Sequence, residues 1–278
     1  MKISMSYWMF EGGLEGQKPV VQAMQEAKDM GYEAIELCIA SQGVLTEKTT
    51  QAECEAIRKK ADEIGIELVG VASGESWTSS PSASDPDVRT TIIKFTQKAL
   101  RITRWLGVDA YLFIPGSVDI FFLPDGEVVP YDICYDRAKE AITQILPVAE
   151  EVGVHLALEN VWNKFLLSPL EFRDFIDSFD SKWVGAYFDV GNVMQTGYPD
   201  QWIRLLGNRI RRVHIKDFKL SIGTAEGFVD LTEGDVDFKA IKTALSEIGY
   251  EGYVTAEMIP HAPGRPEKTV KAMTQLFK

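Results

Sequence analysis

Short runs of branched and aromatic residues alternate along this chain with longer segments whose apolar residues recur at helical spacing. Glycine stands just after most of the helical segments, as is typical of a helix C-terminus. The runs predict strands at residues 2–7, 34–38, 66–72, 109–114, 154–159, 184–189, 210–215 and 253–257. The segments between them predict helices at 19–30, 50–64, 84–106, 131–152, 198–206, 237–248 and 266–277, with another opening at 168.

The regular alternation of strands and helices predicts a parallel sheet, because parallel neighbours need a long crossover that is usually helical. Eight such units predict an α/β protein with a closed (β/α)8 TIM barrel, formed by residues 1–278 as a single domain. No G-x-G-x-x-G follows the first predicted strand, which disfavours an open dinucleotide-binding sheet. The stretch 117–130, which contains Phe121 and Phe122, is interpreted as a loop insertion rather than a linker. A loop with a small hairpin is expected within 218–234.

Four of the predicted strands end in residue types that bind metals. The runs VHLALE, VGAYFD, IRRVH and YVTAE end at Glu159, Asp189, His214 and Glu257. Because side chains alternate along a strand, the apolar neighbours of these residues face the helices and the four polar side chains face the barrel interior. The carboxyl ends of barrel strands form the face where active sites lie. We therefore expect these four side chains to converge on one point.

Three carboxylates and one imidazole suit Mn²⁺ best, with Mg²⁺ or Co²⁺ as alternatives, whereas Zn²⁺ usually prefers more nitrogen or sulfur. A polar residue at one strand end is as often merely solvated as functional. Four on successive carboxyl-terminal strands are harder to explain in that way, and three clustered carboxylates would repel one another without a cation. The sequence therefore predicts one divalent metal ion.

Five segments carry a family resemblance: LENVWN, YFDVGN, VHIKD, EGDVDF and TAEM. They resemble the xylose-isomerase-like TIM-barrel superfamily of sugar and sugar-phosphate isomerases and epimerases, and are most similar to pentulose-5-phosphate and ketose 3-epimerases. The resemblance implies that Glu159, Asp189, His214 and Glu257 hold one divalent ion, usually Mn²⁺ or Mg²⁺. It also implies that the two glutamates exchange protons with opposite faces of a substrate carbon.

The chemistry expected from this set is proton abstraction next to a metal-bound carbonyl, with Glu159 and Glu257 as acid and base. Return of the proton to the other face gives an epimerase, and return to the neighbouring carbon gives an isomerase of a sugar, keto sugar or sugar phosphate. A lyase on the same site is the alternative, either an inosose-type dehydratase or an enzyme that cleaves a 3-keto C-glycoside. An abasic-site endonuclease is a remote alternative, and a non-catalytic binding barrel is a fourth.

Three polar residues are predicted near the substrate. Glu36 is expected to face the interior, where it would contact a substrate hydroxyl or support the metal ligands. Asn192 stands where ketose 3-epimerases for free sugars often have a histidine; it can donate a hydrogen bond but cannot titrate. Lys216 is expected to bind a substrate phosphate or carboxylate, or else to form a salt bridge with Asp217 or Glu257.

Aromatic residues follow several of the predicted strands. Trp8 and Trp162 are predicted to contact the substrate, since sugar faces pack on aromatic rings, and Trp77 and Phe121 have similar positions. Ordinary loop packing is the alternative for each residue taken singly. As a group they indicate a substrate larger or more apolar than a small sugar phosphate.

The composition of the chain argues against nucleic acid and membrane as binding partners. A net charge of −12 disfavours nucleic-acid binding, and no apolar run reaches the roughly 20 residues of a membrane span. The three cysteines are widely spaced and the N-terminus lacks a secretory pattern, so we expect a cytoplasmic enzyme of carbohydrate metabolism. The expected partner is a small carbohydrate, and the sequence leaves a homodimer or a homotetramer open.

Overall fold

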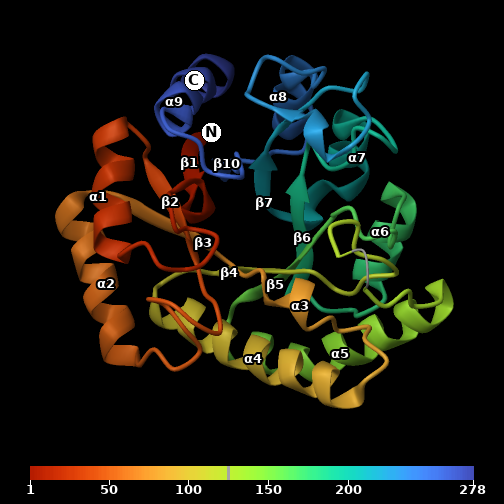
Figure 1. Cartoon of the computed structure of the whole chain (residues 1–278). Helices are drawn as coiled ribbons and strands as arrows, with labels where there is room; N and C mark the ends of the chain where they lie inside the picture. The colour runs from red at the N-terminus through yellow and green to blue at the C-terminus, as the bar shows by residue number, and fades with distance from the viewer. Residues whose placement is uncertain (124–125) are drawn as a thin grey trace.

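The computed structural model describes residues 1–123 and 126–278, and its centre is a closed barrel of eight parallel strands (Figure 1). The first strand pairs with the last and closes the ring, so the predicted (β/α)8 barrel is confirmed. Strand ends differ from the predicted ones by at most two residues. The barrel strands are β1 (Lys2–Ser6), β2 (Ala34–Cys38), β3 (Glu67–Ala72), β4 (Ala110–Phe113), β5 (His155–Glu159), β6 (Val184–Asp189), β7 (Ile210–Ile215) and β10 (Tyr253–Ala256).

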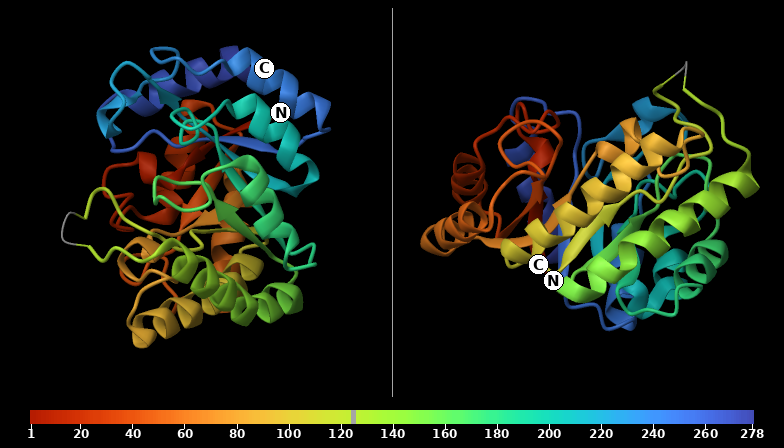
Figure 2. Two further views of the ribbon diagram at one scale, coloured as in Figure 1. Left: turned by 90° about the vertical axis from the view of Figure 1, so that its right-hand side faces the viewer. Right: turned by 90° about the horizontal axis from the view of Figure 1, so that it is seen from below.

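Each barrel strand is followed in the chain by a helix, and the helices surround the outside of the barrel (Figures 1 and 2). Helices α1, α2 and α5 end at a left-handed glycine, as the sequence predicted. Pro147 lies inside α5 and does not end the helix. The outer helices are α1 (Val20–Met30), α2 (Gln51–Ile64), α4 (Pro86–Trp105), α5 (Tyr131–Val152), α6 (Pro169–Asp177), α7 (Pro199–Leu206), α8 (Phe238–Glu247) and α9 (Arg265–Phe277).

Short elements lie in the loops between strands and helices. The hairpin expected within 218–234 is present and begins one residue earlier, pairing β8 (Asp217–Phe218) with β9 (Phe228–Val229). Helix α3 (Glu75–Thr78) follows β3, and single 3-10 turns occupy Tyr7–Met9, Gly207–Arg209 and Ala225–Gly227. The insertion predicted at 117–130 lies between β4 and α5, except that residues 124 and 125 lie outside the described part of the chain.

The barrel interior contains a buried polar layer near the carboxyl ends of the strands. Glu36, His214 and Thr255 are completely buried there, and Tyr187 lies among them. Arg212, two residues before His214, crosses the amino end of the barrel and donates hydrogen bonds to the Val69 carbonyl and to Asp109. Within the described residues, every helix is too short or too polar to cross a membrane.

Candidate metal and proton-transfer site

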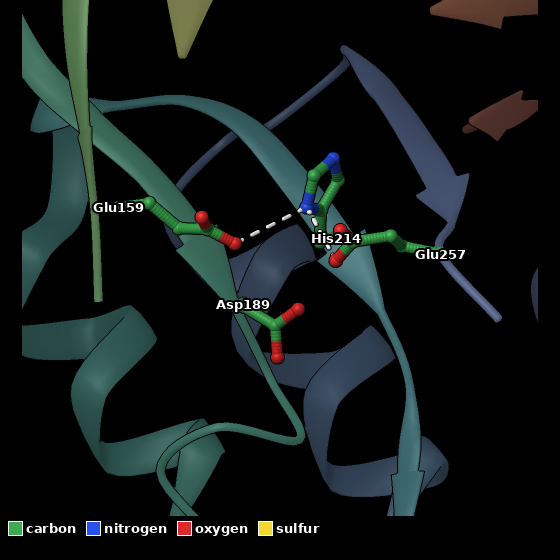
Figure 3. A group of neighbouring side chains, drawn as sticks. All are labelled: Glu159, Asp189, His214 and Glu257. Carbon is green, nitrogen blue, oxygen red and sulfur yellow. Dashed lines mark ion pairs between the residues drawn. The ribbon is translucent and has the colours of Figure 1, made fainter. Parts of the chain in front are cut away.

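Glu159, Asp189, His214 and Glu257 converge at the carboxyl end of the barrel (Figure 3). Each supplies one ligand atom, and these atoms all lie within 4.8 Å of one another. His214 Nδ1 lies 3.1 Å from a Glu257 oxygen and 3.4 Å from a Glu159 oxygen. Strand register explains the convergence, because Asp189 pairs with His214 across β6 and β7, and Glu257 follows Ala256, which pairs with Ile215.

Glu36 holds the imidazole of His214 through a contact with its Nε2 atom. Nε2 of His214 lies 2.9 Å from Glu36 Oε2, and the same oxygen accepts a hydrogen bond from the Tyr187 hydroxyl. This contact makes Nε2 a proton-bearing nitrogen and turns Nδ1 toward Glu159 and Glu257. Burial alone would lower the pKa of His214, but Glu36 and Glu257 outweigh it and raise that pKa well above its usual range, so without a cation Nδ1 also carries a proton. Glu36 thus lies in the interior as predicted, but it is completely buried behind His214 and does not line the substrate cavity.

Two asparagines hold the ends of β5 and β6 together. Asn160 accepts a hydrogen bond from the Asp189 amide and donates one to the Asp189 carbonyl, at 2.9 and 2.8 Å. Asn192 donates its backbone N–H to Asp189 Oδ1 and its side-chain amide to the Asn160 carbonyl. Asn192 also borders the cavity, so it is near the predicted substrate position while it fixes the Asp189 carboxylate.

Lys216 places a cation among these carboxylates. Its Nζ lies 2.6 Å from Glu257 Oε2 and 3.1 Å from Asp189 Oδ2. Burial alone would lower the pKa of Lys216, but Asp189 and Glu257 raise it above its usual range. The salt bridge to Glu257 is one of the two that the sequence suggested, and the one to Asp217 is not formed.

The two glutamates have opposite proton affinities. Burial raises the pKa of Glu159 to about 7, and the nearby Glu257 carboxylate adds to the shift. Burial also acts on Glu257, but Lys216 and His214 outweigh it and lower its pKa to about 2. Without a bound cation, Glu159 therefore keeps its proton to a higher pH than Glu257 does. Carboxyl groups with divergent pKa values suit paired acid and base roles.

The four residues fit a divalent cation. Asp189 Oδ2, His214 Nδ1 and Glu257 Oε2 are buried and have charged neighbours, but none has a partner in hydrogen-bonding geometry. Four ligands around one ion at about 2.1 Å span up to about 4.2 Å, which is close to the spread seen here. Three carboxylates and an imidazole suit Mn²⁺, Mg²⁺ or Co²⁺. The residues present could therefore hold one metal ion.

A cavity of about 600 Å³ opens above the cluster. Glu159 and Glu257 border it, whereas the completely buried His214 does not. Trp8 and Trp162, both predicted to contact the substrate, line its wall. The other predicted residues at the cavity are Asn192 and Lys216, and the remaining lining is largely aromatic and aliphatic.

With this geometry established, comparison with known proteins identifies the family. The sequence profile described as xylose isomerase-like TIM barrel matches residues 24–278. The chain belongs to this family. The match includes the four clustered ligand residues and every barrel strand after β1, so the family's barrel and the site are parts of one domain.

Several family members resemble the chain. The "Putative L-ribulose-5-phosphate 3-epimerase SgbU" of Escherichia coli K12 is 24% identical over 84% of this chain and 81% of its own length. An inosose dehydratase of Clostridium perfringens is 27% identical over 53% of this chain and 56% of its own length. An uncharacterised protein of Methanocaldococcus jannaschii is 28% identical over 44% of this chain and 43% of its own length. The chain thus spans about half the length of the latter two proteins.

Comparison with proteins of known structure gives the same barrel fold. A D-tagatose 3-epimerase-like protein of known structure superposes with a TM-score of 0.79 at 19% identity and covers 99% of this chain and 97% of its own. At that identity the superposition shows the shared barrel. The relatives by sequence include a putative epimerase and a dehydratase.

Sequence reasoning missed the role of Asp217. Its two carboxylate oxygens accept four backbone hydrogen bonds at 2.8–3.2 Å, from Phe218, Thr232, Gly234 and Val236. A Cβ on Gly234 would lie 2.1 Å from Asp217 Oδ1, so only glycine permits this approach. The signal was present in the segments HIKD and EGDVDF, but the sequence does not say which backbone amides an aspartate will meet.

Proposed function

We propose that this chain is a divalent-metal-dependent epimerase or isomerase of a sugar or keto sugar, with Glu159 and Glu257 as its proton-transfer groups. The single observation that carries the proposal is the position of two buried glutamates beside one cavity and within one candidate metal site. Such a pair can remove a proton from a carbon acid on one side and return a proton from the other.

The residue roles follow from charge. Glu257 is ionised near neutral pH and acts as the base that removes the proton next to the substrate carbonyl. Glu159, which also borders the cavity, is the group that returns a proton to the carbon, and in the metal-free protein it has the higher pKa of the two. A metal ion bound by the four ligands, with Mn²⁺ as the first choice, would stabilise the negative charge that develops on the carbonyl oxygen. In the reverse reaction the two glutamates exchange roles.

The other residues orient these groups. Glu36 and Tyr187 fix the ring of His214, and Asn160 and Asn192 fix the Asp189 carboxylate. Lys216 holds Glu257 in its ionised form through a 2.6 Å contact. Trp8 and Trp162 would pack against the apolar faces of the sugar at the cavity wall.

Proton NMR in D₂O tests the proposal. Protein loaded with Mn²⁺ is incubated with ketoses, ketose phosphates and 3-keto glycosides, and product spectra are recorded after removal of the paramagnetic ion. Deuterium at one carbon together with a new epimer or isomer is the expected result. The absence of exchange with all these substrates would contradict the proposal, provided that calorimetry shows the protein to bind the metal.

A dehydratase or other lyase is the second candidate, because it begins with the same proton abstraction and then expels a leaving group. The relationship to inosose dehydratase favours it, as does a cavity with room beyond the reacting carbons. The same spectra distinguish the two reactions. Loss of water or of a substituent from the carbon next to the exchanged position would assign the lyase reaction.

A further inference from the structure

An aromatic wall forms one side of the cavity above the glutamates. Trp77 and Phe122 meet edge to face at 5.1 Å, Phe122 meets Phe121 at 5.1 Å, and Phe121 meets Trp162 at 5.8 Å between ring centroids. Trp162 then packs on Phe228 at 5.0 Å. These five rings come from the segments after β3, β4 and β5 and from β9, and all of them line the cavity.

The aromatic wall extends from the solvent to residues that surround the two glutamates. Phe121 is 50% exposed and Phe122 is 48% exposed, although both pack against other rings. At its inner end the Lys216 ammonium lies 5.6 Å from the centre of the Phe228 ring, and Trp162 donates a hydrogen bond to the Asn192 carbonyl. Exposed apolar surface that continues into a deep cavity is typical of a ligand site.

The charges around the cavity disfavour a phosphorylated substrate. Among the described residues, Lys216 and Arg265 are the cations that line it. Lys216 is paired with Asp189 and Glu257, and Arg265 lies 2.9 Å from Asp230 and donates to the Pro260 carbonyl. Both cations are therefore already neutralised by partners of the protein. The lining also contains four carboxylates, which would repel a phosphate group.

The volume of the cavity favours a ligand larger than one sugar ring. At about 600 Å³ it lies in the middle of the range for drug-sized ligands, which are larger than one sugar ring. A single sugar bound at Glu159 and Glu257 would leave the rings of Phe121, Phe122 and Trp77 uncovered. An aromatic or other planar apolar substituent on the sugar would cover them and pack edge to face or offset against them.

The structure assigns to this cavity an uncharged keto sugar that carries a planar apolar substituent, such as an aryl group, rather than a free sugar or a sugar phosphate. This assignment rests on the proposed function for the location of the reacting carbon. The sugar lies against Glu159, Glu257 and Asn192, and the substituent lies along the aromatic wall toward Phe121 and Phe122.

Binding and turnover test the assignment separately. Calorimetry with the Mn²⁺-loaded protein compares phenyl β-D-glucopyranoside with methyl β-D-glucopyranoside, neither of which has a carbonyl for turnover. We expect the phenyl compound to bind at least tenfold more tightly. Solvent exchange is then followed by NMR for the matching phenyl and methyl 3-oxo glucosides and for the methyl 3-oxo glucoside 6-phosphate, with the highest kcat/KM expected for the phenyl compound.

The variant Phe121→Ala localises the effect. It should reduce the affinity for the phenyl glucoside at least fivefold, with a smaller effect on the methyl glucoside. Tyr198→Ala is the matched control, because Tyr198 is 68% exposed and does not line the cavity, and it should leave both affinities unchanged.

The outcomes separate this assignment from the proposed function. Equal affinities for the two glucosides, no binding of the phenyl compound at millimolar concentration, or a preference for the phosphate would overturn the substrate class. An aryl preference in binding with no solvent exchange in any 3-oxo glucoside would support the substrate class and contradict the proton-transfer function.

Discussion

Two polar clusters lie inside the barrel, and they differ in whether their buried charged atoms have hydrogen-bonding partners. Near the amino end, Arg212 donates through all three of its guanidinium nitrogens, to Val69, Arg211 and Asp109. Near the carboxyl end, buried atoms of Asp189, His214 and Glu257 have charged neighbours but no partner in hydrogen-bonding geometry. Buried polar atoms normally form hydrogen bonds, because leaving one without them costs free energy. The difference indicates that the first cluster stabilises the barrel and the second is arranged for a ligand.

The largest effect should come from Glu257→Gln, which removes the proposed base from the second cluster. We expect kcat to fall by about 10²–10⁴-fold, the usual contribution of a positioned acid or base. Initial rates of deuterium incorporation by NMR measure it, and Glu251→Gln, at an exposed residue that does not line the cavity, is the control. If kcat of the metal-loaded Glu257→Gln variant stays at the wild-type value, Glu257 has no part in proton transfer.

Glu36→Gln tests whether the buried glutamate serves the metal ligands. The change keeps the shape but removes the charge that orients His214 Nε2, so metal affinity should fall by about 10–100-fold. Calorimetric titration with Mn²⁺ measures the dissociation constant. Tyr187→Phe is the control, because it removes a hydrogen bond to Glu36 and leaves the carboxylate, and its effect should be smaller. An unchanged affinity in Glu36→Gln would show that the contact has only a packing role.

Metal affinity should also depend on pH. Metal binding requires ionised carboxylates, and burial together with Glu257 raises the pKa of Glu159 to about 7. Protons therefore compete with the metal below pH 7, and the affinity should rise by up to about tenfold per pH unit between pH 5.5 and 7 for this proton. Titration calorimetry in buffers that do not bind metal checks the slope. Glu159→Gln should lower the slope, and an equal slope in that variant would contradict the assignment of the proton to Glu159.

The raised pKa of Glu159 also makes the stability of the metal-free protein depend on pH, in the opposite direction to the metal affinity. Glu159 binds its proton more tightly in the native state than in the unfolded chain, so its contribution to stability is present at low pH. That contribution is lost as the pH rises from about 4.5 to about 7. Urea titrations of metal-free protein at several pH values, with Glu159→Gln as the comparison, measure it.

Arg212→Met should have the smallest effect on function. Loss of its hydrogen bonds should lower the free energy of unfolding by about 1–3 kcal/mol, measured by chemical denaturation. Metal affinity should stay within about twofold of the wild-type value, because Arg212 lies at the other end of the barrel. A large change in metal affinity would mean that the two clusters are coupled through β7, and the contrast between them would no longer hold.

Strand periodicity was sufficient to predict the barrel and to bring the four ligand residues to one end. That inference needs only the alternation of side chains along each strand and the rule that parallel barrel strands share their carboxyl ends. The inward direction of Glu36 followed from the same alternation. The partner of Glu36 could not be predicted, because the contact between Glu36 on β2 and His214 on β7 depends on how far the side chains reach across the interior.

The loops were predictable only in outline. The sequence indicated a small hairpin between 218 and 234, but not that Asp217 would accept four backbone amides around it. Lys216 could be placed on the face of His214, whereas its pairing with both Asp189 and Glu257 required the positions of three strand ends. Such contacts join residues far apart in sequence, and local patterns carry little information about them.

The hydrogen bonds that Asp217 accepts from backbone amides indicate which parts of this protein could be redesigned. An asparagine at that position would turn an NH₂ group toward amides that need an acceptor, so the loop from Thr232 to Val236 tolerates little change. Phe121 and Phe122, in the loop between β4 and α5, have half-exposed rings and, among the described residues, no comparable network. Mutant libraries that seek new substrates should therefore randomise Phe121 and Phe122 and leave Asp217 and its loop intact.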